Sequence, residues 1–92
     1  MANIQVRCTE ENDGWTCQVT VLEGQDSSHH TVQVPEEDYN DLVEDTEPED
    51  LVEASFEFLL DREPKESILR QFDIMTIEQY FPNYQDKIQD YL

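Results

Sequence analysis

Four residues of this chain could bind a metal ion or carry out nucleophilic chemistry: Cys8, Cys17, His29 and His30. Thiolate and imidazole groups are the usual zinc ligands, and zinc sites place them two to five residues apart along the chain. Here the cysteines are widely separated and the histidines are adjacent, so the spacing matches no zinc motif. A small metal-binding or enzymatic domain built on these four residues is therefore the second hypothesis, and we expect no cofactor.

Other catalytic patterns are missing from the sequence. The acidic cluster Glu47, Glu49 and Asp50 lacks the Asp-x-Asp-x-Asp-Gly loop of a calcium site. No Gly-x-Ser-x-Gly elbow is present, and the chain has only two glycines for a phosphate-binding loop. We therefore predict that the protein is not an enzyme.

The chain is strongly acidic, with 23 Asp and Glu against 5 Lys and Arg and a formal net charge of −18. Nucleic-acid binding depends on neutralising phosphates with basic side chains, so direct binding to nucleic acid is disfavoured. The acidity indicates adaptation to high salt, an acidic face for a basic protein partner (nucleic-acid mimicry included), or no specific role. The strand-helix-helix order from His30 to Arg62 also allows a ribbon-helix-helix regulator, although Thr31 and Gln33 offer that strand no positive charge.

The positions of the cysteines and histidines depend on a predicted β-meander. Alternating apolar residues predict antiparallel strands over 3–10, 15–23 and 29–34. Two loops keep the apolar residues of the first hairpin on one face, either a two-residue turn at Asp13-Gly14 or a four-residue loop over Glu11–Gly14. The four-residue loop would place Cys8 directly opposite Cys17, close enough to react, and we expect both to be thiols in a cytoplasm.

Helical periodicity and proline positions predict helices after residue 35. Thr46 and Glu49 form a capping-box pattern, and Pro48 suits a first helical turn. Strands followed by helices indicate one α+β domain over residues 1–92, in which the helices cover one face of the meander. The expected helices span residues 36–45, 48–62, 65–72, 74–81 and 83–91.

The run SFEFLLDREPKESILRQFDI, followed by YFPNY, lies within residues 51–84. It resembles the C-terminal half of a family of small prokaryotic proteins without an assigned activity. The resemblance implies one small complete domain of unknown function, and it transfers no catalytic residues.

Our leading hypothesis is a non-enzymatic protein-interaction or regulatory module with a salt-adapted surface. No apolar run is long enough to span a membrane and no signal sequence is visible, so we expect a cytoplasmic monomer or weakly associating homodimer with an unknown protein partner. Basic and aromatic side chains together favour protein contacts, which places the expected contact surface within 62–84. Its residues are Arg62, Lys65, Arg70, Phe72, Tyr80 and Tyr84, with Phe81 beside them.

Overall fold

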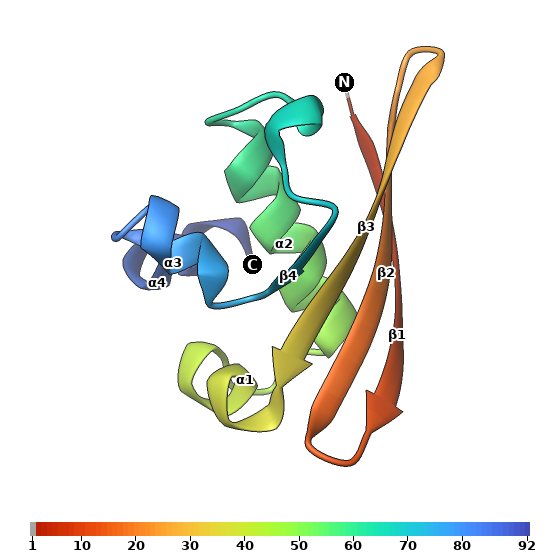
Figure 1. Cartoon of the computed structure of the whole chain (residues 1–92). Helices are drawn as coiled ribbons and strands as arrows, with labels where there is room; N and C mark the ends of the chain where they lie inside the picture. Colours follow the sequence, from red (N-terminus) through yellow and green to blue (C-terminus); the bar gives the residue numbers. More distant parts are fainter. Residues whose placement is uncertain (1) are drawn as a thin grey trace.

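Four strands form one mixed sheet in the computed structural model, which describes residues 2–92 (Figure 1). The first three strands pair antiparallel in chain order, and the short fourth strand pairs parallel with the third. The fold is α+β as predicted, but the sheet has one strand more than the predicted meander. The strands are β1 (Asn3–Glu11), β2 (Gly14–Glu23), β3 (Asp26–Pro35) and β4 (Gln71–Asp73).

All helices lie on one side of the sheet (Figure 1). The predicted helices over 36–45 and 48–62 are present but shorter, and those over 74–81 and 83–91 are reduced to short helical turns. Within residues 2–92, no helix is long and apolar enough to cross a membrane. The helical segments are α1 (Glu36–Leu42), α2 (Pro48–Leu60), the 3₁₀ turn η1 (Lys65–Ser67), α3 (Thr76–Tyr80), α4 (Tyr84–Lys87) and the 3₁₀ turn η2 (Ile88–Tyr91).

The first hairpin has the register that the four-residue loop predicts. Glu10 pairs with Trp15, and one further pair, Glu11 with Gly14, tightens the connection. Gly14 has a φ of 148°, and a Cβ atom at this position would collide with the carbonyl oxygen of Val34 on the neighbouring strand. Only glycine therefore fits at the start of β2.

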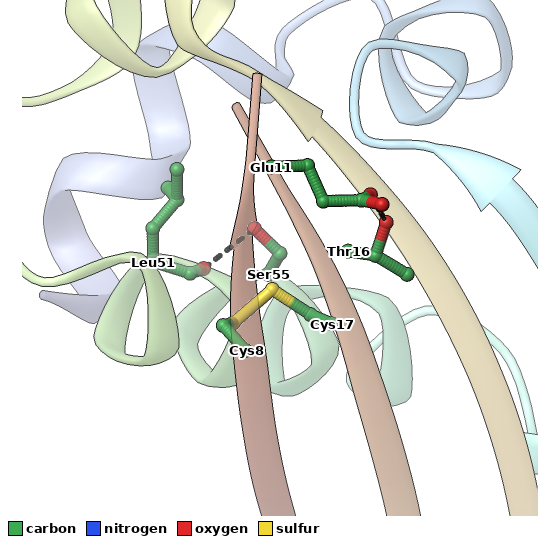
Figure 2. The surroundings of a disulfide bond; sticks show 6 residues. All are labelled: Cys8, Glu11, Thr16, Cys17, Leu51 and Ser55. Atoms are coloured by element: carbon green, nitrogen blue, oxygen red, sulfur yellow. Dashed lines mark hydrogen bonds between the residues drawn. A yellow bond between two sulfur atoms is a disulfide. The ribbon is translucent and has the colours of Figure 1, made fainter. Parts of the chain in front are cut away.

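Cys8 and Cys17 pair directly across β1 and β2, with Cα atoms 4.0 Å apart, which confirms that they are close enough to react (Figure 2). The structure joins them in a disulfide, whereas the sequence analysis expected thiols. The physical reason is their placement, because two cysteines opposite each other on one face need no backbone movement to bond. Cys17 is fully buried and Cys8 is half-buried.

Helix α2 lies between the sheet and the C-terminal helices (Figure 1). Phe56 faces the sheet, with its ring centroid 5.1 Å from that of His30. Phe58 faces the other way, against Tyr84 at 5.4 Å and Tyr91 at 5.8 Å. The core therefore continues on both sides of one helix.

The N-terminus of α2 differs in part from the prediction. Pro48 is its first residue, as expected, because a missing N–H is harmless in the first turn. The predicted capping box is wrong: the residue before the helix is Glu47, which makes no side-chain capping bond, and the Thr46 hydroxyl donates to the carbonyl of Glu44 instead.

The predicted helix over 65–72 is wrong, because only Lys65–Ser67 forms a helical turn and the last two residues, Gln71 and Phe72, belong to strand β4. The backbone N–H of Thr31 on β3 donates to the carbonyl of Arg70 at 2.7 Å. Phe72 and Ile74 are both buried, which is the period-two pattern of a strand. The edge of β3 offers unpaired backbone groups, and pairing with them outweighs the local helical preference of this short apolar run.

We predict that the stability of this fold rises with salt. Glu53 and Glu57 are exposed on α2, followed by exposed Asp61, so like charges repeat at i, i+4. Each such pair costs about 0.2–0.5 kcal/mol without screening, and 1 M salt shortens the screening length to about 3 Å. The urea midpoint should therefore rise from dilute buffer to molar KCl.

The control for this prediction is the variant E53Q/E57Q, which removes the repeated charges. Its urea midpoint should rise less with KCl than that of the wild type. A wild-type midpoint that stays flat or falls would show that charge repulsion does not limit stability.

We further predict that reduction of the Cys8–Cys17 disulfide destabilises the protein. The bond closes a loop with a sequence separation of 9 residues. Restricting a loop of this length in the unfolded chain stabilises the fold by about 2–3 kcal/mol. Urea unfolding with and without dithiothreitol measures the difference.

The variant C8S/C17S is the control, because its urea midpoint should not respond to dithiothreitol. If complete reduction, verified by thiol titration, leaves the wild-type midpoint unchanged, the disulfide does not contribute to stability.

Candidate functional site

An apolar pocket of about 130 Å³ opens beside the C-terminal end of α2. One wall comes from the end of α2 and the residues that follow it. The other comes from α3 and from the segment that leads into β4. We call it the 59–81 pocket. It is lined by Leu59, Glu63, Ser67, Ile68, Leu69, Phe72, Thr76, Ile77, Tyr80 and Phe81.

Two large apolar side chains at this pocket are exposed to solvent. Leu69 is 46% exposed and Tyr80 is 66% exposed. In the part of the chain that the structure describes, only one other large hydrophobic side chain is exposed, Leu92 at 46%. Most of the exposed large apolar surface is thus gathered at one pocket, which is typical of a contact site.

Glu63 adds a carboxyl group to the mostly apolar lining. It is half-buried, and this burial raises the pKa of its carboxyl group above the ordinary value. Among residues 2–92 no basic side chain forms an ion pair with Glu63. A partly desolvated carboxylate without a counter-ion favours a ligand that brings a positive charge or a hydrogen-bond donor.

Arg62 is engaged with its own helix rather than with the pocket. Its Nη1 atom donates to the carbonyl of Phe58 at 3.0 Å and to the hydroxyl of Tyr91 at 3.2 Å. The guanidinium carbon lies 3.7 Å from the centroid of the Phe58 ring, at cation–π distance. Arg62 therefore satisfies a carbonyl at the C-terminus of α2 and fastens η2 to it.

Lys65 and Arg70 have different surroundings. The Lys65 side chain is only 5% exposed, and its Nζ atom lies 3.2 Å from Glu66 and 3.6 Å from Glu23. The hydrogen bond that Lys65 donates to Glu66 raises the pKa of Lys65 above its ordinary value. Arg70 is exposed and forms no ion pair within residues 2–92, so of these two it is the base available to a partner.

The four aromatic residues of the predicted contact surface also differ in exposure, as the basic residues do. Tyr84 is fully buried, and its hydroxyl donates to Ser55 at 2.7 Å, since the Ser55 hydroxyl already donates to a backbone carbonyl. Burial raises the pKa of Tyr84 well above its usual range. Phe72 is buried in the pocket wall, Phe81 is half-buried, and Tyr80 is exposed. The exposed apolar surface in this segment is thus Tyr80 together with Leu69. The sequence analysis selected Tyr80 but not Leu69.

The four residues of the metal-binding hypothesis do not come together. Both sulfurs are in the disulfide, and the exposed His29 lies 3.2 Å from the Thr20 hydroxyl. Within residues 2–92, no three His, Cys, Asp or Glu side chains are grouped as metal ligands would be. No observation therefore favours this hypothesis.

His30 is a buried core residue whose two ring nitrogens are both hydrogen-bonded. Nδ1 lies 2.8 Å from the carbonyl oxygen of Leu69, and Nε2 lies 2.8 Å from the hydroxyl of Ser28. A carbonyl only accepts, so Nδ1 carries the proton and Nε2 accepts from Ser28. Burial, the largest cause, lowers the pKa of His30, which fits a neutral imidazole.

A scan of the chain against models of protein families found no match, and searches of curated proteins and of solved structures found none either. The resemblance of residues 51–84 to a small prokaryotic family therefore stays a prediction.

We predict that His30 makes the stability sensitive to mild acid. Its pKa is lower in the folded protein than the unfolded value of about 6.5, so the unfolded chain binds the proton first. This contribution is complete above about pH 6.5 and is lost as pH falls toward the folded pKa. The variant H30Q should lose about 1–3 kcal/mol at neutral pH, since its buried partners become unpaired.

The advantage of the wild type over H30Q should shrink from pH 7.5 to pH 5.5, as measured by urea unfolding. H29Q, which changes the exposed neighbour, is the control and should follow the wild type. An advantage of equal size at both pH values would contradict the lowered pKa of His30.

Proposed function

We propose that this protein is a non-enzymatic protein-interaction module that binds its partner at the 59–81 pocket. The supporting observation is the gathering of exposed Leu69 and Tyr80 at the rim of one apolar pocket. Aromatic side chains beside a pocket are the usual anchors of protein interfaces. The proposal keeps the segment that the sequence analysis selected but moves its centre to these two residues.

The partner that fits this pocket is a basic protein presenting an apolar side chain next to a lysine or arginine. The apolar side chain would enter the pocket, and the positive charge would meet Glu63, which forms no ion pair within residues 2–92. The net charge of −18 attracts a basic partner and repels nucleic acids and acidic proteins. Charge therefore selects the class of partner, and the pocket provides the specific contact.

A salt-adapted surface is the second part of the proposal. The acidic side chains on α1 and α2 remain hydrated and screened in high salt, while the apolar contact at the pocket is strengthened there. We expect partner binding to depend less steeply on salt than a purely electrostatic complex would.

We propose a cytoplasmic location, as the sequence suggests. The alternative is an oxidising compartment, which the disulfide favours. Trapping of free thiols in intact source cells, followed by mass spectrometry, decides between the two. Alkylated Cys8 and Cys17 would support the cytoplasm, and an unmodified disulfide would contradict it.

The proposed function is tested by changing the rim of the pocket. The protein would be used to enrich binders from its source cells, and the candidate would be purified and its affinity measured directly. We expect L69S and Y80S each to weaken that affinity about tenfold, the cost of losing an interface anchor. E63K should also weaken binding, because it replaces the favourable charge with a repelling one.

L92S is the matched control, because Leu92 is as exposed as Leu69, at 46%, but does not line the pocket. It should bind like the wild type. If the pocket variants and L92S bind a directly verified partner equally well, the interface lies elsewhere on the molecule.

A further inference from the structure

Strand β1 forms one edge of the sheet, and its outer side is open. It pairs with β2 along its whole length, from Asn3 to Glu11, and β2 is its only neighbour in the sheet. In residues 2–92 no strand pairs with the other side of β1. Natural proteins usually block so long an edge with proline, a bulge or a covering segment, because unpaired N–H and C=O groups recruit further strands.

The distance between paired Cα atoms shows which backbone groups point outward. Opposite residues of an antiparallel pair are about 5.5 Å apart when they exchange hydrogen bonds and about 4.5 Å apart when they do not. The Cα atoms of Cys8 and Cys17 are 4.0 Å apart, so the backbone N–H and C=O of Cys8 do not hydrogen-bond to β2. Since the two kinds of pair alternate along a strand, Ile4, Val6 and Cys8 all direct their N–H and C=O groups to the open edge.

The same three residues have incompletely covered side chains. Ile4, Val6 and Cys8 face the core side of the sheet, but each is only half-buried. Their partners on β2 are covered almost completely: Val19 is 1% exposed and Cys17 is fully buried. A strand added to the edge would therefore satisfy backbone groups and cover apolar surface at the same residues.

The charge of this strand, like that of β2 and β3, is unlike that of the helices. From Asn3 to Thr9 it contains no acidic residue and one base, Arg7, although the whole chain has 23 acids. Two molecules of net charge −18 repel each other, so they can associate stably only where acids are few. The open edge of β1 is such a place.

We propose that this edge binds a second copy of the chain, and that the two β1 strands pair antiparallel around a two-fold axis at Val6. Even-numbered residues must face even-numbered ones to keep both cores on one side of the joined sheet. An axis at Arg7 would place two arginines opposite each other, whereas the axis at Val6 places Arg7 opposite Gln5 of the partner subunit. This register joins the outward groups in about six backbone hydrogen bonds.

A strand of another protein is the competing occupant, and self-complementarity favours the second copy. The register around Val6 pairs apolar residues with apolar residues and brings no like charges directly together. Glu10 and Glu11 lie at the end of the strand, and this register places Glu10 opposite Ala2 of the partner subunit rather than opposite another acid. The 59–81 pocket lies beside β4 at the opposite end of the strand order, so the dimer leaves both pockets free and the inference does not rest on the proposed function.

The association is measured by sedimentation of the oxidised wild type from about 20 µM to about 1 mM. We expect a reversible dimer that becomes more populated in molar KCl, because salt screens the repulsion between the two acidic bodies. V6P should abolish it, since the N–H that proline removes points away from β2 and the first hairpin is left intact. Y80S is the matched control and should dimerise like the wild type.

Amide hydrogen exchange on the wild type locates the interface without any substitution. This measurement therefore tests the proposal even if V6P does not fold. The outward amides of Ile4, Val6 and Cys8 should exchange about tenfold more slowly at high than at low protein concentration. The inward amides of Gln5 and Arg7, already bonded to β2, should not respond. A monomer throughout the concentration range, a folded V6P that still dimerises, or outward amides that ignore concentration would each overturn the proposal.

Discussion

The structure depends on the burial of α2 on two sides. Phe56 and Phe58 are two positions apart, so they point in nearly opposite directions from the helix. One packs on the sheet through His30, and the other on the C-terminal helices through Tyr84. A chain of 92 residues buries only a modest core. Placing one apolar helix in the middle lets three layers share it, and it leaves the solvent only a narrow acidic stripe of α2.

Two of the five basic residues, Arg62 and Lys65, fasten this arrangement. Arg62 lies over Phe58 and ties η2 to the end of α2. Lys65 links η1 to Glu23 at the β2–β3 hairpin, which is distant from η1 in the sequence. These contacts explain why positive charges that look free in the sequence contribute little to an open surface.

How much could be predicted depended on the range of the interactions involved. The hairpin follows from period-two alternation and one glycine turn, which are local. They left two registers open, and the structure has the one that places Cys8 opposite Cys17. The parallel strand β4 could not be predicted, because the run from Ile68 to Phe72 fits a short helix as well as a strand and only the distant edge of β3 decides. The pocket was missed for the same reason: Leu69 falls within the predicted helix over 65–72, but it lies exposed in the connection between η1 and β4.

The parallel pairing of β3 with β4 has a kinetic consequence. Thr31 and Gln71 are paired across a crossover that contains α1 and α2, whereas the two hairpins close through tight turns. Closing a long loop costs more chain entropy than closing a short one, and contacts between sequence-distant residues form slowly. We therefore expect β4 to dock after the hairpins and α2 have assembled. The same short strand is held by few backbone hydrogen bonds, so it should be the first segment to detach in the native ensemble. Because β4 forms part of the pocket wall, the pocket should open and re-form together with the least stable part of the sheet.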